Sequence, residues 1–129
     1  MDNNLNYGVV GNCRTAALVS ARGTIEWMCL PDFDSPSVFA SLLDRRKGGC
    51  FGFDVAEEYR ISQAYIPHTN ILATTFSADE GKFVILDFMP CYRSRRDEHY
   101  MPPELYRYVR WVRGRPRLRV HYAPAPDYA

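Results

Sequence analysis

Residues 70–89 (NILATTFSADEGKFVILDFM) decide the fold class, because their pattern is that of an antiparallel hairpin. Residues 70–77 and 82–89 are rich in β-branched and aromatic side chains, which favour strands. Residues 78–81 (ADEG) between them carry a turn signal that ends in glycine. The stretch therefore predicts two neighbouring strands of an antiparallel sheet.

The same pattern occurs twice more along the chain. Residues 15–20 and 24–29 flank a short connection with a glycine, and so do residues 106–112 and 118–122. Each pair predicts a further hairpin. Weaker strand patterns occupy residues 50–54 and 59–66.

One short helix is predicted among these strands. Ser35 suits an N-cap, Pro36 suits the first helical position, and Gly48 with Gly49 would end the helix. The apolar face of this helix would consist of Val38, Phe39, Leu42 and Leu43. We therefore expect an all-β, mainly antiparallel β-sandwich with one short helix.

The composition is that of a globular protein forming one domain over residues 1–129. Its 129 residues are 47% hydrophobic, and a formal net charge of +1 gives no electrostatic reason to expect nucleic acid or a membrane as partner. The first residues lack a secretory signal pattern, so we expect a cytoplasmic protein with reduced cysteines. Cysteines and histidines are dispersed, and no metal or cofactor is expected.

Residues 29–39 (CLPDFDSPSVF) hold two carboxylates and raise the question of a glycosidase site. A glycosidase needs two carboxyl groups on opposite sides of the bond that breaks. Asp32 and Asp34 project from one backbone segment that Pro31 and Pro36 hold in a turn, so they cannot easily straddle a sugar. We expect a rigid turn or the lip of a binding site, in which Asp34 also helps to cap the helix, and no catalytic residue.

Two charged residues are expected to find charged partners. Arg14 follows a glycine-containing loop, where it could hold a sugar hydroxyl or pair with Asp32 or Asp34. Asp87 lies within the apolar residues 82–89 and needs a partner if it is buried. We expect that partner to be an arginine.

Trp27 is an aromatic candidate for sugar binding. Strict alternation would place it on one strand face with Ile25 and Cys29. A tryptophan can stack on a sugar ring, but packing in the core is the commoner role of a strand aromatic.

The last third of the chain is rich in arginine and aromatic residues, as in proteins that bind single-stranded nucleic acid. No oligonucleotide-binding motif accompanies this composition, so nucleic-acid binding is not expected. Apolar residues alternate instead with basic ones, which predicts a strand with one buried face and one face in water or in an interface. The alternating residues are Arg117, Leu118, Arg119, Val120, His121 and Tyr122.

A series of segments extends over nearly the whole chain. They are YGVVGNCRTAALVS (7–20), GTIEWMCLPDFDSPSVFASLLD (23–44), KGGCF (47–51), YIPHTNILATTF (65–76), LDFMP (86–90) and VRGRPRLRVHYAPAPDYA (112–129). In this order they resemble the N-terminal domain of prokaryotic glycoside hydrolase family 15 proteins, the glucoamylase-like and trehalase-like group.

The resemblance implies a β-sandwich that precedes an (α/α)6 catalytic barrel. The barrel would hydrolyse α-glucosidic bonds in glucans, glucosides or trehalose with inversion, and it would hold both catalytic glutamates. The chain alone is therefore expected to be inactive. The family's sandwich is longer than this chain, so we expect an incomplete sandwich with an unpaired strand edge.

The expected function is that of a non-catalytic domain that packs on the barrel and shapes the substrate entrance. Candidate residues for the entrance or the domain interface are Arg14, Trp27, Asp32, Asp34 and Ser35. Two alternatives stay open at this point: an independent carbohydrate-binding module, and an interaction or homo-oligomerisation domain that uses an unpaired edge or apolar patch.

Overall fold

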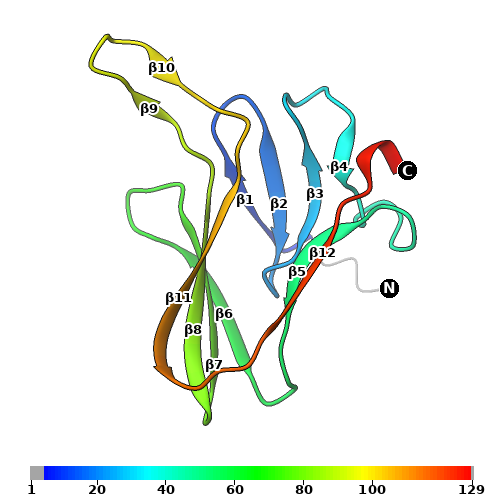
Figure 1. Ribbon diagram of the computed structural model, residues 1–129, viewed down its shortest axis with the longest axis vertical. Coiled ribbons are helices and arrows are strands. Elements are labelled where there is room, and N and C mark those ends of the chain that lie inside the picture. The colour runs from blue at the N-terminus through cyan, green and yellow to red at the C-terminus, as the bar shows by residue number, and fades with distance from the viewer. Residues whose placement is uncertain (1–4, 129) are drawn as a thin grey trace.

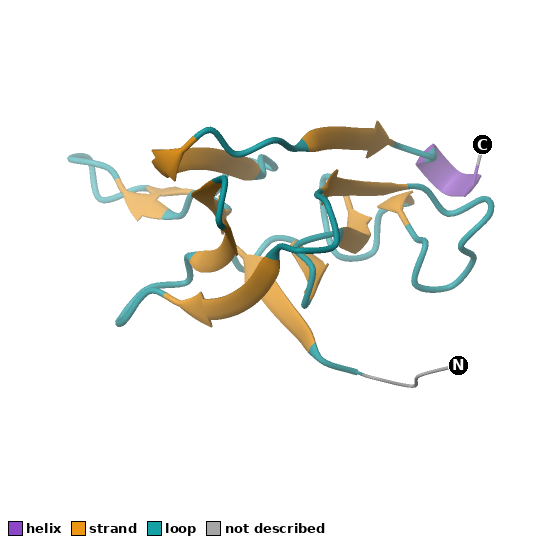
Figure 2. Cartoon of the chain, turned by 90° about the horizontal axis from the view of Figure 1, so that it is seen from below, coloured by secondary structure: helices purple, strands orange, loops and turns teal. Residues whose placement is uncertain are grey.

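The computed structural model describes residues 5–128, and its regular secondary structure is almost entirely β-strand (Figures 1 and 2). The larger sheet contains, in order, β1 (Tyr7–Gly11), β2 (Ala16–Ser20), β3 (Ile25–Cys29), β5 (Cys50–Asp54) and β12 (Arg119–Ala123), with β4 (Ser37–Phe39) paired to β3. The second sheet contains β11 (Tyr106–Gly114), β8 (Gly81–Phe88), β7 (Leu72–Ala78) and β6 (Arg60–Tyr65). A separate hairpin contains β9 (Tyr92–Arg93) and β10 (His99–Tyr100). The pairings are antiparallel, and the predicted all-β, sandwich-like class is confirmed.

The core lies between the two sheets and is built from alternate residues of their strands. One cluster includes Val10, Val19, Ile25, Met28, Phe39 and Leu72, and the other includes Phe53, Tyr59, Phe76, Phe83 and Ile85. Phe51 packs against both clusters. Burying each large apolar side chain contributes roughly 1.5–3 kcal/mol, so these clusters are the main favourable term of folding.

The predicted hairpins are confirmed in two of three cases. β2 pairs with β3, and β7 pairs with β8 in a continuous register from Leu72 opposite Asp87 to Ala78 opposite Gly81. The prediction of a hairpin between β11 and β12 is wrong, because β11 pairs with β8 and β12 pairs with β5. The chain crosses between the sheets after Gly114, where the Arg115 N–H donates to the Glu80 carbonyl at 2.8 Å.

The predicted helix after Ser35 is also wrong. Residues 37–39 form β4 instead, and Leu43, assigned to the buried helix face, is 66% exposed. The Ala40 N–H donates to the Gly48 carbonyl at 2.7 Å, so the backbone there bonds a later segment, and residues 41–47 form turns in place of a continuous helix. A short apolar run cannot by itself separate a strand from a helix. Asp34 consequently has no helix to cap.

The only helical element in residues 5–128 is η1 (Pro126–Tyr128), a 3-10 turn of three residues, and that part of the chain contains no helix able to cross a membrane. Residues 90–104 contain the exposed β9–β10 hairpin. Figure 1 shows this hairpin at the same end of the sheets as the β1–β2 and β3–β4 connections. These three connections therefore share one end of the molecule, which we call the loop end.

The alternation of β12 is as predicted, but its apolar face is not buried. Val120 and Tyr122 are 56% and 62% exposed, although they lie opposite Phe53 and Phe51 of β5. Because directly opposed residues of antiparallel strands share a face, both side chains are on the side that faces the second sheet. That sheet ends at β11 and does not cover them.

Candidate functional site

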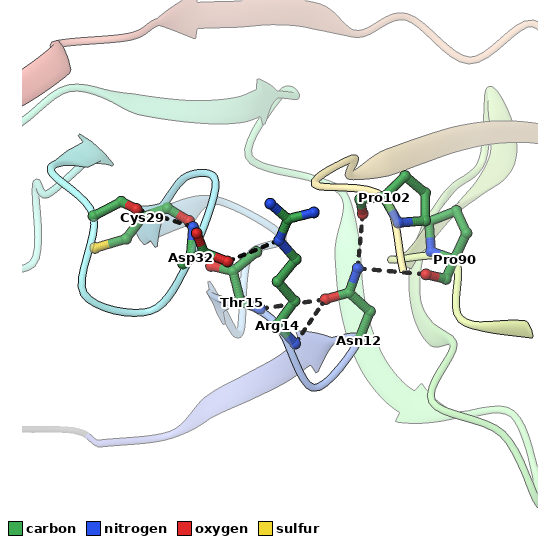
Figure 3. A network of polar contacts seen from close by, with 8 residues as sticks. Asn12, Arg14, Thr15, Cys29, Asp32, Pro90 and Pro102 are labelled. Atoms are coloured by element: carbon green, nitrogen blue, oxygen red, sulfur yellow. Dashed lines mark hydrogen bonds and ion pairs between the residues drawn. The ribbon is translucent and has the colours of Figure 1, made fainter. Parts of the chain in front are cut away.

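Arg14 and Asp32 form an ion pair between two connections at the loop end (Figure 3). Arg14 Nε lies 2.7 Å from Asp32 Oδ1, and the Phe33 N–H donates to the Arg14 carbonyl at 3.1 Å. The two side chains are 39% and 47% exposed, so the pair contributes no more than about 1 kcal/mol of stability. Of the partners left open for Arg14, the structure shows Asp32, and this pair joins the β1–β2 connection to the β3–β4 connection.

The turn that carries Asp32 is closed by Ser35. The Asp32 N–H donates to Ser35 Oγ at 3.0 Å, and the Ser35 N–H donates to the Asp32 carbonyl at 3.1 Å. These bonds confirm that the segment is a turn held by its own side chains. Asp34 is exposed and forms no ion pair within residues 5–128. The two carboxylates therefore do not act together in this arrangement.

Asn12 was not identified as a site residue from the sequence, yet it holds the site together. We call the hydrogen-bonded set of Asn12, Arg14 and Asp32 the network. The side chain of Asn12 is buried, and Nδ2 donates to the carbonyls of Pro102 at 2.7 Å and Pro90 at 3.4 Å. Its Oδ1 accepts from the N–H groups of Arg14 at 3.1 Å and Thr15 at 3.2 Å. The signal in the sequence was an asparagine that follows a glycine. The side chain of asparagine often accepts hydrogen bonds from backbone N–H groups two or three residues later in the chain. Only folding brings the two proline carbonyls to it.

The terminal nitrogens of Arg14 are the chemically available groups of this site. Nε is used by Asp32, whereas Nη1 and Nη2 make no hydrogen bond to any described residue (Figure 3). A guanidinium group held on one edge presents its other donors in a fixed direction. The site can thus donate hydrogen bonds to a carboxylate, a carbonyl or a sugar hydroxyl.

Nothing else in the network supplies reactive chemistry. Burial raises the pKa of the Cys29 thiol, which keeps it protonated and unreactive at neutral pH. The Cys29 carbonyl accepts a hydrogen bond from the Thr15 hydroxyl. Within residues 5–128, no three His, Cys, Asp or Glu side chains come together in a way that could hold a metal ion.

A hollow of about 350 Å³ lies beside the network. Its walls come from Gly11, Asn12 and Cys13, from the Asn70–Ile71 pair, and from residues 88–92. Asn12 belongs to both the hollow and the network, so the same side chain that bonds Pro90 and Pro102 also shapes this concave surface.

Trp27 does not belong to this network, and the alternation predicted for its strand is wrong. Leu18 lies opposite Trp27 but Val19 lies opposite Ile25, so a bulge at Glu26 shifts the register. Ile25 and Met28 consequently face the core, while Trp27 is half-buried on the other face. A bulge cannot be recognised from alternation, because alternation assumes that it is absent.

Comparison with known proteins supplies the family. The family described as "Trehalase-like, N-terminal" matches residues 6–129. The chain belongs to this family. Among curated relatives, the trehalase of Thermoplasma volcanium is 37% identical over 130 residues, covering 95% of the chain and 20% of the relative. The trehalase of Mycolicibacterium smegmatis is 34% identical over 139 residues, again covering 95% of the chain and 20% of the relative.

A third relative, the trehalase of Thermoplasma acidophilum, is 39% identical over 120 residues, covering 87% of the chain and 19% of the relative. The chain thus spans about a fifth of the length of the curated relatives that it matches. No solved structure matches the chain. The resemblance of the sequence to the N-terminal domain of trehalase-like proteins is confirmed.

Proposed function

We propose that this trehalase-like N-terminal domain is a non-catalytic part of a glycosidase that hydrolyses trehalose. Its loop end packs against the catalytic part and forms one wall of the substrate entrance. The observation that carries the proposal is the preorganised network of Asn12, Arg14 and Asp32, in which two guanidinium nitrogens of Arg14 have no partner among the described residues.

The non-catalytic role is supported by the positions of the carboxylates. Asp32 and Asp34 are held on one turn, and Asp32 is already paired with Arg14. Glycoside hydrolysis needs an acid and a second carboxylate on opposite sides of the scissile bond. The purified chain is therefore expected not to release glucose from trehalose, and turnover that is abolished by Asp32→Ala would contradict the proposal.

The role at the entrance is supported by rigidity. Asn12 ties the β1–β2 connection to two proline carbonyls, and Ser35 closes the turn that carries Asp32. Holding donors in place before a ligand arrives lowers the entropy cost of binding. A trehalose molecule offers only hydroxyl and ether oxygens, which the free donors of Arg14 can bind.

The test uses a full-length trehalase-like protein that carries this domain. Arg14→Ala is expected to raise KM for trehalose about 3- to 10-fold with kcat within about twofold. The reason is that losing one hydrogen bond of moderate strength weakens binding by up to about 10-fold. Arg22→Ala is the control, since Arg22 is exposed in the β2–β3 connection, at the opposite end of the sheets. Unchanged KM in Arg14→Ala would refute the entrance role, and glucan binding by the isolated chain would favour a carbohydrate-binding module.

A further inference from the structure

The hollow of about 350 Å³ beside the network has walls of aromatic, amide and thiol side chains. Phe88 ends β8, Tyr92 belongs to β9, and Asn70 lies in the β6–β7 connection. Cys13 and Cys91 are exposed and are also wall residues. Small-molecule sites in proteins have volumes of about 300–1,000 Å³. The hollow is at the lower end of this range, so it has room for a small ligand.

Each aromatic wall residue is held by a second ring. The rings of Phe88 and Tyr106 are stacked, with centroids 5.4 Å apart and an interplanar angle of 8°. Tyr106 is fixed in turn by its hydroxyl, which donates to Glu104 Oε2 at 2.8 Å. The ring centroid of Tyr92 lies 4.8 Å from that of Tyr100. Because these neighbours limit the rotation of the wall rings, a ligand need not order them when it binds.

The walls of the hollow are electrically neutral. Among the described residues that form them, none has a charged side chain. Arg14 and Arg93, which follow the wall residues Cys13 and Tyr92, are each paired with an aspartate. An ion that entered the hollow would lose water and find no counter-charge in the walls, and burying an unpaired charge is costly. The hollow therefore favours an uncharged ligand.

The walls also offer hydrogen-bonding groups. Asn70 is exposed, and within residues 5–128 its side-chain amide bonds no other residue, although its neighbours Thr69 and Ile71 do bond each other. An amide supplies both donors and an acceptor. The C–H groups on the face of a sugar ring are apolar and pack on aromatic rings, whereas its hydroxyls need hydrogen-bond partners. Neutral walls with aromatic rings and a free amide match the chemistry of a sugar.

We propose that the hollow is a non-catalytic binding site for one glucosyl unit of a short α-glucoside such as trehalose. Phe88 and Tyr92 contact the apolar face of the sugar ring, and Asn70 bonds its hydroxyls. The choice of glucose rests on the proposed function, since trehalose consists of two glucose rings. Arg14 is not a wall residue, so this site is separate from the donors proposed for the substrate entrance. The site holds a sugar at the loop end, next to that entrance.

Two thiols report whether the hollow is occupied. Cys13 and Cys91 are exposed wall residues, whereas Cys50 is half-buried on β5 and is not a wall residue. The purified chain is treated with N-ethylmaleimide at increasing trehalose concentration, and the alkylation rate of each cysteine is measured by mass spectrometry. A covered thiol reacts only while the site is empty, so trehalose at about ten times its Kd should slow the alkylation of Cys13 and Cys91 about 10-fold. The rate at Cys50 should not change.

Matched variants separate binding in the hollow from a general effect of the sugar. Tyr92→Ala and Asn70→Ala should each remove the protection while circular dichroism shows an unchanged fold. Tyr122→Ala is the control and should keep the protection, because Tyr122 is 62% exposed on β12 and is not a wall residue. Protection that persists in both wall variants would overturn the proposal.

A comparison of ligands tests the proposal on the unmodified chain, even if a variant unfolds. Sorbitol has hydroxyls but no ring face, so at the same concentration it should not protect the thiols. Because the hollow is small, maltoheptaose should protect no better than trehalose. No protection by trehalose, equal protection by sorbitol, or clearly stronger protection by maltoheptaose would each overturn the proposal.

The two proposals fail in different experiments. If trehalose does not protect the thiols but Arg14→Ala raises KM in the full-length protein, the site in the hollow is refuted and the entrance role stands. If trehalose protects the thiols but Arg14→Ala leaves KM unchanged, the entrance role is refuted and the site in the hollow stands.

Discussion

The ion pair between Asp87 and Arg107 is the feature of this fold whose removal has the clearest expected consequence. Both side chains are buried, at 0% and 2% exposure, and two contacts of 2.7 and 3.0 Å join them. The expectation that Asp87 has an arginine partner is thus confirmed. Burial raises the pKa of Asp87, and the hydrogen bond and charge of Arg107 oppose that rise. We predict that Asp87→Asn, which keeps the shape of the side chain, strongly destabilises the domain.

The size of the stability loss in Asp87→Asn follows from the contacts that Arg107 makes besides its ion pair with Asp87. Its guanidinium donates to the carbonyls of Phe51 and Gly23, and it lies 4.8 Å from the ring centroids of both Phe51 and Phe53. Arg107 therefore links the two sheets and cannot move into water without breaking these contacts. A buried charge left without its partner costs about 3–5 kcal/mol. This is a large part of the roughly 5–15 kcal/mol that stabilises a typical domain.

Urea unfolding followed by circular dichroism and tryptophan fluorescence measures this cost. Asp87→Asn should lower the free energy of unfolding by about 3–5 kcal/mol. Asp97→Asn is the matched control, because the Arg93–Asp97 pair has the same 2.7 Å contact but side chains that are 64% and 74% exposed. This control should cost less than about 1 kcal/mol.

A double variant distinguishes a buried charge from lost packing. Asp87→Leu combined with Arg107→Met removes both charges, and replacing a buried pair by apolar residues is often nearly neutral. The double variant should therefore be more stable than Asp87→Asn. A loss below about 1 kcal/mol in Asp87→Asn, or a double variant less stable than the single one, would refute the reasoning.

Three further predictions concern other parts of the fold. Asn12→Ala should cost about 2 kcal/mol in urea unfolding, because it leaves buried backbone groups without their partner; a loss within experimental error would contradict the anchoring role. The hydrogen bond to Glu26 raises the pKa of Tyr7 from 10.0 to about 12, so the stability that this contact contributes is present below pH 10 and lost as the pH rises through about 12. The absorbance titration of Tyr7→Phe should accordingly lose a component near pH 12, and an unchanged titration above pH 11 would argue against the contact. Gly49 has φ +71°, and a Cβ there would lie 2.3 Å from the Ala123 carbonyl oxygen, so Gly49→Ala should cost more than about 1 kcal/mol, measured by the shift in thermal midpoint.

Sequence patterns predicted those parts of the fold that depend on neighbours along the chain. The β7–β8 hairpin was predictable because strand-forming residues flank a short turn and alternate over their whole length. The pairing of Asp87 with an arginine was predictable because a buried carboxylate needs a partner, whereas for Arg14 the sequence left Asp32, Asp34 and a sugar hydroxyl open.

Other parts depend on contacts that no local pattern records. The bulge at Glu26 turns Trp27 away from the core face, and the bonds of Ala40 and Ser41 to Gly48 and Gly49 replace the predicted helix. At the loop end, Asn12 was missed because its partners Pro90 and Pro102 are distant in sequence. The roles of Arg14, Trp27, Asp32, Asp34 and Ser35 at a substrate entrance stay predictions.

The sequence by itself determined the strand content, the antiparallel class and the family. Alternation of side chains, turn residues and segments that resemble the family are all properties of the chain read in order. Only the tertiary structure decided that β11 and β12 separate into different sheets, and therefore that Val120 and Tyr122 of β12 stay exposed. The physical reason is that a strand can pair with any available strand edge, and the favoured partner is the one that lets the apolar faces be buried. A short connection between two strands brings them close without requiring that they bond each other.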